Sequence, residues 1–136
     1  MPTAAQVIGA SAEAAVARRL RAEGWRILGR NLRVGRAEVD ILAVDPGWAG
    51  SGPALVAVEV RWRRRRDFGL PEETVDRAKV ARLRSAALAL RELPPSGRAP
   101  DGAVNREGLA VPRLPVRVDL VAVEPGGVIR HHRAIG

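Results

Sequence analysis

Cysteine and tyrosine are absent from this 136-residue sequence, and histidine, lysine and aromatic residues are scarce. The absence of cysteine excludes a disulfide framework, thiolate zinc sites, iron–sulfur clusters and cysteine nucleophiles. The two histidines, His131 and His132, are adjacent near the C-terminus, so a multi-histidine metal site is excluded and we expect both on the surface. With three tryptophans and one phenylalanine, the chain must build its core from Val, Leu, Ile and Ala.

Long apolar runs are also missing from the chain. No stretch approaches the roughly 18 uncharged apolar residues of a membrane span, so we expect no membrane partner. No positive charge precedes Arg18, and Glu13 interrupts the first apolar stretch, which argues against a secretory signal peptide. The expected location is the cytoplasm, and the length fits one domain over residues 1–136.

Positive charge dominates what is present. The chain has 23 basic and 15 acidic residues and a net charge of +8, and Lys79 is its only lysine. Such an excess on a small domain favours a polyanionic partner, most commonly nucleic acid. The alternative is that arginine of this abundance partly reflects a GC-rich genome.

The order of expected elements is helix, three strands, helix, and one or two further strands. Pro71 suits the first turn of the second helix, and Pro94 and Pro95 end it. Residues 94–115, rich in proline and glycine, read as a flexible insertion. This order predicts an α/β fold whose early strands form an antiparallel meander with helices on the faces of the sheet. The expected ranges are helix 6–23, strands 25–34, 37–44 and 54–62, a helix from 71, strand 116–123, and a possible hairpin strand 128–133 after Gly126 and Gly127.

Three acidic residues fall where a folded protein normally avoids charge. Glu13 shares a helical stripe with Val16 and Leu20, whereas Asp40 and Glu59 each lie between apolar residues of expected strands. Burying an unpaired carboxylate costs several kcal/mol, so each is expected to have a partner.

Adjacent strands let Asp40 and Glu59 point to one face, which Arg61 shares because it follows Glu59 by two residues. Two clustered carboxylates form a hard oxygen site suited to Mg²⁺ or Mn²⁺, which could activate a phosphodiester. The alternative is that both acids are ion-paired with arginines such as Arg33, Arg36 or Arg61.

Four segments of the sequence resemble the YraN-like family of small bacterial proteins. They are, in chain order, GASAEAAVARRL, GWRILGRNLRVGRAEVDILAVD, VAVEVRWRRRRDFGLPEETVDRAK and VRVDLVAV. That family is similar to the PD-(D/E)xK, or restriction-endonuclease-like, superfamily, which includes Holliday-junction resolvases. The resemblance implies an αβββαβ core with a mixed central sheet flanked by helices, and a Mg²⁺-dependent phosphodiesterase site. It implies catalytic roles for Glu13, Asp40 and Glu59, with Asp40 and Glu59 as the metal ligands.

One departure from the family pattern bears on activity. The family usually has lysine two residues after the third-strand acid, where this chain has Arg61. Arginine keeps the positive charge but does not transfer a proton. Lys79, which also matches a family lysine, is the available substitute, although a solvated helix lysine is the simpler interpretation. The site therefore either cleaves with Arg61 and Lys79 in catalytic roles, or binds without turnover.

A run of arginines leaves the third strand beside Glu59. Arg61, Arg63, Arg64, Arg65 and Arg66 surround Trp62, and each could neutralise a nucleic-acid phosphate. The alternative is a solvated edge that discourages strand pairing. We therefore expect a nucleic-acid-binding, metal-dependent DNA endonuclease that is selective for DNA structure, for which a homodimer would suit two-strand chemistry. A catalytically silent binding or adaptor module and a protein–protein scaffold are the alternatives.

Overall fold

A computed structural model describes residues 3–62, 75–92 and 111–135 of the chain. Its elements follow the predicted order, which confirms the α/β class and the αβββαβ core. They are α1 (Ala4–Ala22), β1 (Arg26–Val34), β2 (Ala37–Asp45), β3 (Ala54–Trp62), α2 (Arg77–Arg91), β4 (Val116–Glu124) and β5 (Val128–His132).

The five strands form one mixed sheet in the order β1-β2-β3-β4-β5. The pairs β1–β2, β2–β3 and β4–β5 are antiparallel, as the predicted meander and hairpin require, and β3–β4 is parallel. A parallel pair needs a crossover connection between its strands, and α2 lies in that connection. The predicted final hairpin is therefore present, with Gly126 and Gly127 both at positive φ in its turn.

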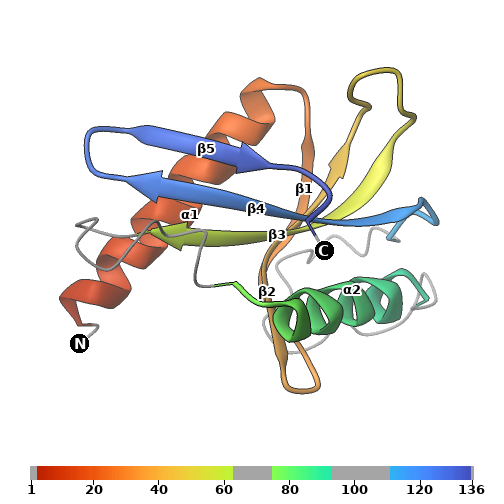
Figure 1. The fold of residues 1–136 in the computed structure, drawn as a ribbon, viewed down its shortest axis with the longest axis horizontal. Coiled ribbons are helices and arrows are strands. Elements are labelled where there is room, and N and C mark those ends of the chain that lie inside the picture. Colours follow the sequence, from red (N-terminus) through yellow and green to blue (C-terminus); the bar gives the residue numbers. More distant parts are fainter. Residues whose placement is uncertain (1–2, 63–74, 93–110, 136) are drawn as a thin grey trace.

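The helices cover opposite faces of the sheet, so the core has two layers. Val16 and Leu20 of α1 pack with Val56 and Val58 of β3 on one face. Leu83 of α2 packs in a second cluster on the other face, which includes Leu55 and Ala57 of β3. Figure 1 shows α1 crossing behind β4 and β5, and α2 lying apart from it beside β2. Because β3 is buried on both faces, its sequence reads as a nearly continuous apolar run.

The second helix begins later than the sequence predicted. Asp76 is its N-cap, with extended backbone and a side chain that accepts a hydrogen bond from the Lys79 amide at 2.8 Å. Because the Asp76 backbone is extended, α2 begins at Arg77, and the predicted start at Pro71 was wrong for this helix. Pro71 itself lies outside the described residues.

The predicted insertion at 94–115 is described only in its last five residues, since residues 93–110 lie outside the described part. Val111 and Leu114 pack against the core on the α2 side of the sheet. The Leu55 amide donates a hydrogen bond to the Pro115 carbonyl at 2.8 Å. Residues 111–115 are thus attached to the sheet and lead directly into β4.

Within the described residues, neither helix is both long enough and apolar enough to cross a bilayer.

Candidate metal and catalytic site

The site forms where β2 separates from β3. Their residue pairing runs from Asp45–Ala54 to Ile41–Val58 and ends there, whereas the pairing of β2 with β1 continues to Ala37. Beyond that point, the Val60 amide donates a hydrogen bond to Asp40 Oδ2 at 2.9 Å. The Asp40 carboxylate thus replaces the backbone acceptor that Val60 would have in a regular ladder. This bond fixes Asp40 beside the end of β3.

Glu59 occupies the same end of β3 and is 4% exposed. Its Oε1 lies 3.4 Å from Arg61 Nε and 3.7 Å from Lys79 Nζ. Its Oε2 is buried and has no hydrogen-bond partner. An unsatisfied buried carboxylate oxygen is costly, so this atom marks the place where a ligand would be stabilised.

The three predicted acids line one cavity of about 280 Å³. Glu13 reaches it from α1, Asp40 from β2 and Glu59 from β3. Glu13 is half-buried, and its Oε2 lies 3.9 Å from a terminal nitrogen of Arg30. The rest of the wall comes from the α1 backbone region and the end of β3: Gly9, Val60, Arg61 and Trp62.

Burial raises the pKa of all three carboxyls, and the charge of a nearby acid raises each pKa further. Burial, then the charge of Asp40, raises the pKa of Glu59 to about 7, against the opposing effect of Lys79 and Arg61. Burial raises the pKa of Asp40, although the hydrogen bond from Val60 opposes the change. Burial and the charge of Asp40 raise the pKa of Glu13 to about 6. The cavity therefore favours a bound proton or cation over three free carboxylates.

The donor set fits a small hard cation with few protein ligands. Asp40 and Glu59 offer carboxylate oxygens, which Mg²⁺ and Mn²⁺ prefer, and Mg²⁺ is commonly held by one or two carboxylates with waters completing its shell. A closed protein cage is absent from the described residues, which contain no group of three or more His, Asp or Glu side chains placed to hold a metal ion. The unpartnered Glu59 Oε2 agrees with an open site of this kind.

The structure places several of the predicted site residues at one cavity. Glu13, Asp40, Glu59 and Arg61 line the cavity, and Lys79 reaches Glu59 from α2 instead of pointing into solvent. The ion-pair alternative holds in part, because Glu59 Oε1 does contact Arg61, while Oε2 stays unpartnered. The remaining predicted nucleic-acid contacts, Arg63, Arg64, Arg65 and Arg66, lie outside the described residues.

A second acidic cluster escaped the sequence analysis. Asp119 is fully buried and accepts two hydrogen bonds from Arg117, at 2.8 and 2.9 Å. Arg117 also donates to Asp45 Oδ2 at 2.7 Å. The His131 Nε2 atom lies 2.8 Å from Asp119 Oδ2, and the Ala134 amide donates to Oδ1 at 3.0 Å. The signal was present, because Asp119 lies between Val118 and Leu120 just as Asp40 lies between apolar residues.

The network around Asp119 differs from the acidic cavity, because both oxygens of its buried carboxylate accept hydrogen bonds. Hydrogen bonds from His131 and Arg117 outweigh burial and lower the pKa of Asp119. The bonds join β2, β4 and β5, so their role is to hold the end of the sheet together. The expectation that both histidines are on the surface was wrong for His131, whose side chain is 11% exposed, because Asp119 binds it.

Comparison with known proteins places the chain in a family. A UPF0102 protein of Symbiobacterium thermophilum is 40% identical over 120 residues, which cover 88% of this chain and 83% of the relative. One of Paenarthrobacter aurescens is 36% identical over 126 residues (93% and 87%), and one of Beutenbergia cavernae is 39% identical over 137 residues (98% of each). The model of uncharacterised protein family UPF0102 matches residues 12–123, which include the three acids and Lys79. The predicted YraN-like relationship is thus confirmed, and the chain belongs to the UPF0102 family.

Proposed function

We propose that this protein is a divalent-metal-dependent endonuclease that cleaves DNA phosphodiesters, with selectivity for DNA structure. The observation that carries the proposal is Glu59 Oε2, a buried carboxylate oxygen without a hydrogen-bond partner. It belongs to a cavity that Asp40 and Glu13 also line. Clustered acids with raised pKa values in a cavity are typical of a site that acts on a ligand, which supports the proposal.

Asp40 and Glu59 are the residues that would hold the metal ion. A bound Mg²⁺ or Mn²⁺ supplies a Lewis acid that polarises a phosphodiester and lowers the pKa of a bound water. Asp40 is suited to this role because the Val60 amide fixes one of its oxygens. Glu13, half-buried on the opposite wall, adds negative charge that strengthens the attraction for a cation.

Arg61 and Lys79 together take the roles of the lysine that the family usually has two residues after the third-strand acid. Both lie near Glu59 Oε1, at 3.4 and 3.7 Å. Arginine keeps its proton under ordinary conditions and forms paired hydrogen bonds to phosphate, so Arg61 binds the phosphodiester. Lys79 orients the attacking water with its ammonium group.

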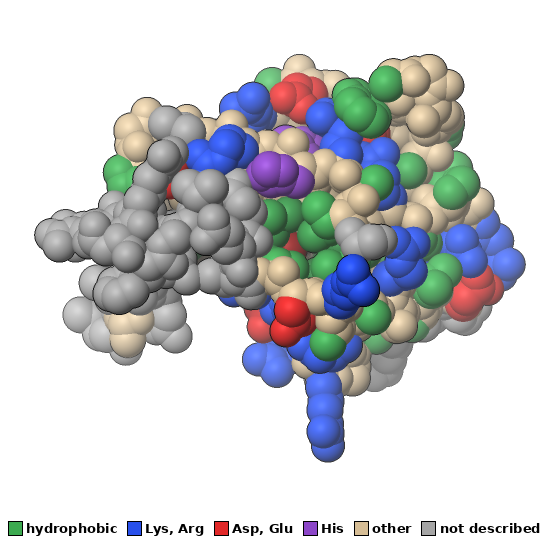
Figure 2. Space-filling model, viewed as in Figure 1, with side chains coloured by type: hydrophobic (Ala, Val, Ile, Leu, Met, Phe, Trp, Pro, Cys, Tyr) green, Lys and Arg blue, Asp and Glu red, His purple; other side chains and the backbone are tan. Residues whose placement is uncertain are grey.

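The charge of the chain supports a polyanionic substrate. The net charge is +8, and Figure 2 shows Lys and Arg side chains at several places on one face of the molecule. Phosphate contacts of this kind read no sequence and weaken steeply with salt. We therefore expect DNA affinity to fall as salt rises and to depend little on DNA sequence.

Cleavage of branched and linear DNA with Mg²⁺, Mn²⁺ or EDTA tests the proposal. Wild-type protein should cut only with a metal, and Asp40→Asn should cut far more slowly, because it removes the negative charge of a metal ligand. Glu23→Gln is the control, since Glu23 is an exposed acid just after α1 that does not line the cavity. Absence of cutting by wild type, or equal cutting by wild type and Asp40→Asn, would reject the enzyme.

A second candidate is a silent module of the same fold that binds nucleic acid without turnover. Arg61 favours it, because arginine stands where lysine is usual and contacts Glu59. This candidate predicts salt-sensitive DNA binding that survives EDTA, with no cutting by wild type. Arg61→Lys separates the two candidates: newly gained cutting would identify a silenced site.

A further inference from the structure

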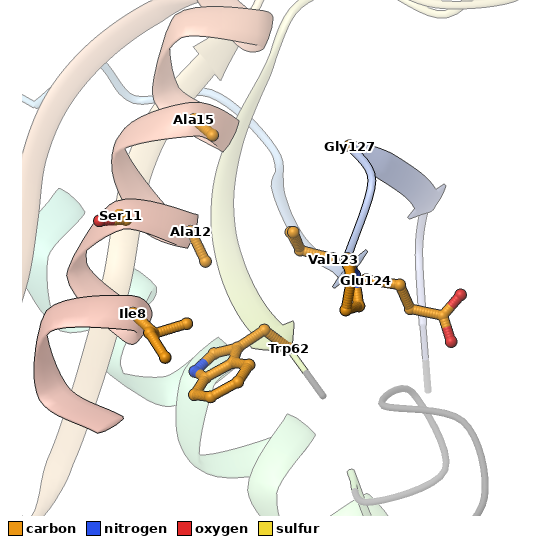
Figure 3. Close-up of a pocket in the computed structure, with 9 residues that line it drawn as sticks. Ile8, Ser11, Ala12, Ala15, Trp62, Val123, Glu124 and Gly127 are labelled. Atoms are coloured by element: carbon orange, nitrogen blue, oxygen red, sulfur yellow. The ribbon is translucent and has the colours of Figure 1, made fainter. Parts of the chain in front are cut away.

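A second, apolar cavity of about 450 Å³ lies beside the acidic one. Figure 3 shows its two walls, with Ile8, Ser11 and Ala15 on α1 and Val123 at the end of β4. Trp62, the last residue of β3, extends its indole between them toward Ile8. The volume lies within the range of ligand-binding pockets, roughly 300–1,000 Å³. Ile8 is 40% exposed, so the cavity opens to solvent on this side.

Trp62 is the boundary between the two cavities. It lines both of them, and the successive residues Ile8 and Gly9 line the apolar and the acidic cavity respectively. The indole lies against α1 at this point, since a Cβ at Gly9 would be in ordinary van der Waals contact with the indole Nε1, at 3.4 Å. A ligand held at Asp40 and Glu59 would therefore have its neighbouring group within reach of the apolar cavity.

We propose that the apolar cavity receives the base of an unpaired nucleotide of DNA, stacked on Trp62, while the adjoining phosphate lies at the acidic cavity. This inference rests on the proposed function. The acidic cavity suits a metal-bound phosphodiester, and the flat, largely apolar group attached nearest to a DNA phosphate is its base. An aromatic wall such as Trp62 suits any base, because every base has a π-face.

The consequence is a preference for unpaired nucleotides. A base within a duplex is stacked and paired, so it enters a pocket only after the cost of unstacking, which is least for a base already unpaired. The cavity therefore accounts for selectivity toward bulges, flaps and gaps without a separate recognition domain.

Binding of two matched DNA probes tests the inference. One is a short duplex with a single unpaired 2-aminopurine, and the other is the same duplex fully paired, both measured with Ca²⁺, which carboxylate oxygens also bind, in place of Mg²⁺. Wild type should bind the first several-fold more tightly and quench its fluorescence. Trp62→Leu should weaken binding of the unpaired probe roughly five- to hundredfold, the range of base–aromatic stacking, and Trp62→Phe should restore part of it.

Two further variants test the inference independently of Trp62, in case the Trp62 variants fail to fold. One fills the cavity, and the other is its control. Ser11→Met places a larger side chain in the cavity from an exposed position on α1, and should bring the ratio of the two affinities close to one. Ala10→Met makes the same change at the neighbouring exposed position, which does not line the cavity, and should keep the wild-type ratio.

Three outcomes would overturn the inference. They are equal affinity of wild type for both probes, equal effects of Ser11→Met and Ala10→Met, and a change of oligomeric state in Ser11→Met alone, measured by light scattering. The last outcome would assign the cavity to a second copy of the chain. Metal-dependent cutting of the paired probe tests the proposed function separately. An enzyme that cuts without preferring unpaired bases would reject only the inference, and a preference without cutting would reject only the nuclease.

Discussion

Relative to wild type, the metal-free Glu59→Gln variant should become more stable as the pH rises, although the substitution alters a buried ion pair. The folded pKa of Glu59 is raised from 4.5 to about 7, so its carboxyl contributes most to stability when protonated. That contribution is fully present below pH 4.5 and is lost as the pH rises through 7. At about 1.4 kcal/mol per pKa unit, the loss is on the order of 3 kcal/mol at pH 8. Glutamine has no charge to bury and avoids this loss.

The decisive quantity is how the difference in free energy of unfolding between Glu59→Gln and wild type changes with pH. The buried amide that Glu59→Gln introduces has its own cost of about 1–3 kcal/mol, which is the same at each pH. The free energy of unfolding of Glu59→Gln relative to wild type should therefore increase by about 2–3 kcal/mol between pH 5 and pH 8. Urea unfolding at several pH values without metal measures it. Added Mg²⁺ should stabilise wild type, by about 2.7 kcal/mol at a hundred times its Kd, and the variant much less.

Glu23→Gln is the control for this experiment. Glu23 is exposed just after α1, so its replacement should change stability by less than about 0.5 kcal/mol at either pH. A difference between Glu59→Gln and wild type that is the same at pH 5 and pH 8 would refute the reasoning, because Glu59 would then carry no unfavourable buried charge.

The other predictions concern the fold. Asp119→Asn should cost about 1–3 kcal/mol in urea unfolding at pH 7, because it removes one of the two carboxylates that pair with the half-buried Arg117; a loss under about 0.5 kcal/mol would contradict this. The pKa of Asp119 is lowered from 3.8, so its contribution is present above pH 3.8 and is lost as the pH falls below that value. Asp76→Ala should cost about 1 kcal/mol by removing the N-cap bond, and Asp76→Ser should restore most of it. Leu83→Ala should cost about 2–5 kcal/mol, against little change for the exposed Arg82→Ala.

The strands were largely predictable because their patterns are local. The apolar run of β3 predicted a strand, and its bounds agree with the structure. The start of α2 was missed for a physical reason. Pro71 and Asp76 are both good helix starts in sequence, and the extended backbone at Asp76 decides between them.

The site was predicted less completely than the fold. Alternation along β3 correctly placed Glu59 and Arg61 together, and their 3.4 Å contact follows from that spacing. The contact from Lys79 was not predictable, since it depends on how α2 packs against the sheet. The Val60–Asp40 bond was equally hidden, because it exists only where β2 leaves β3.

By itself, the sequence determined the order of elements, the family, and the presence of carboxylates inside apolar strands. It could not distinguish Glu59 from Asp119, because both lie between aliphatic residues of a buried strand. The tertiary structure decided that Arg117 and His131 satisfy Asp119, while one oxygen of Glu59 stays without a hydrogen bond. The physical reason is that a carboxylate's partners come from other strands and helices, at positions that sequence spacing does not encode.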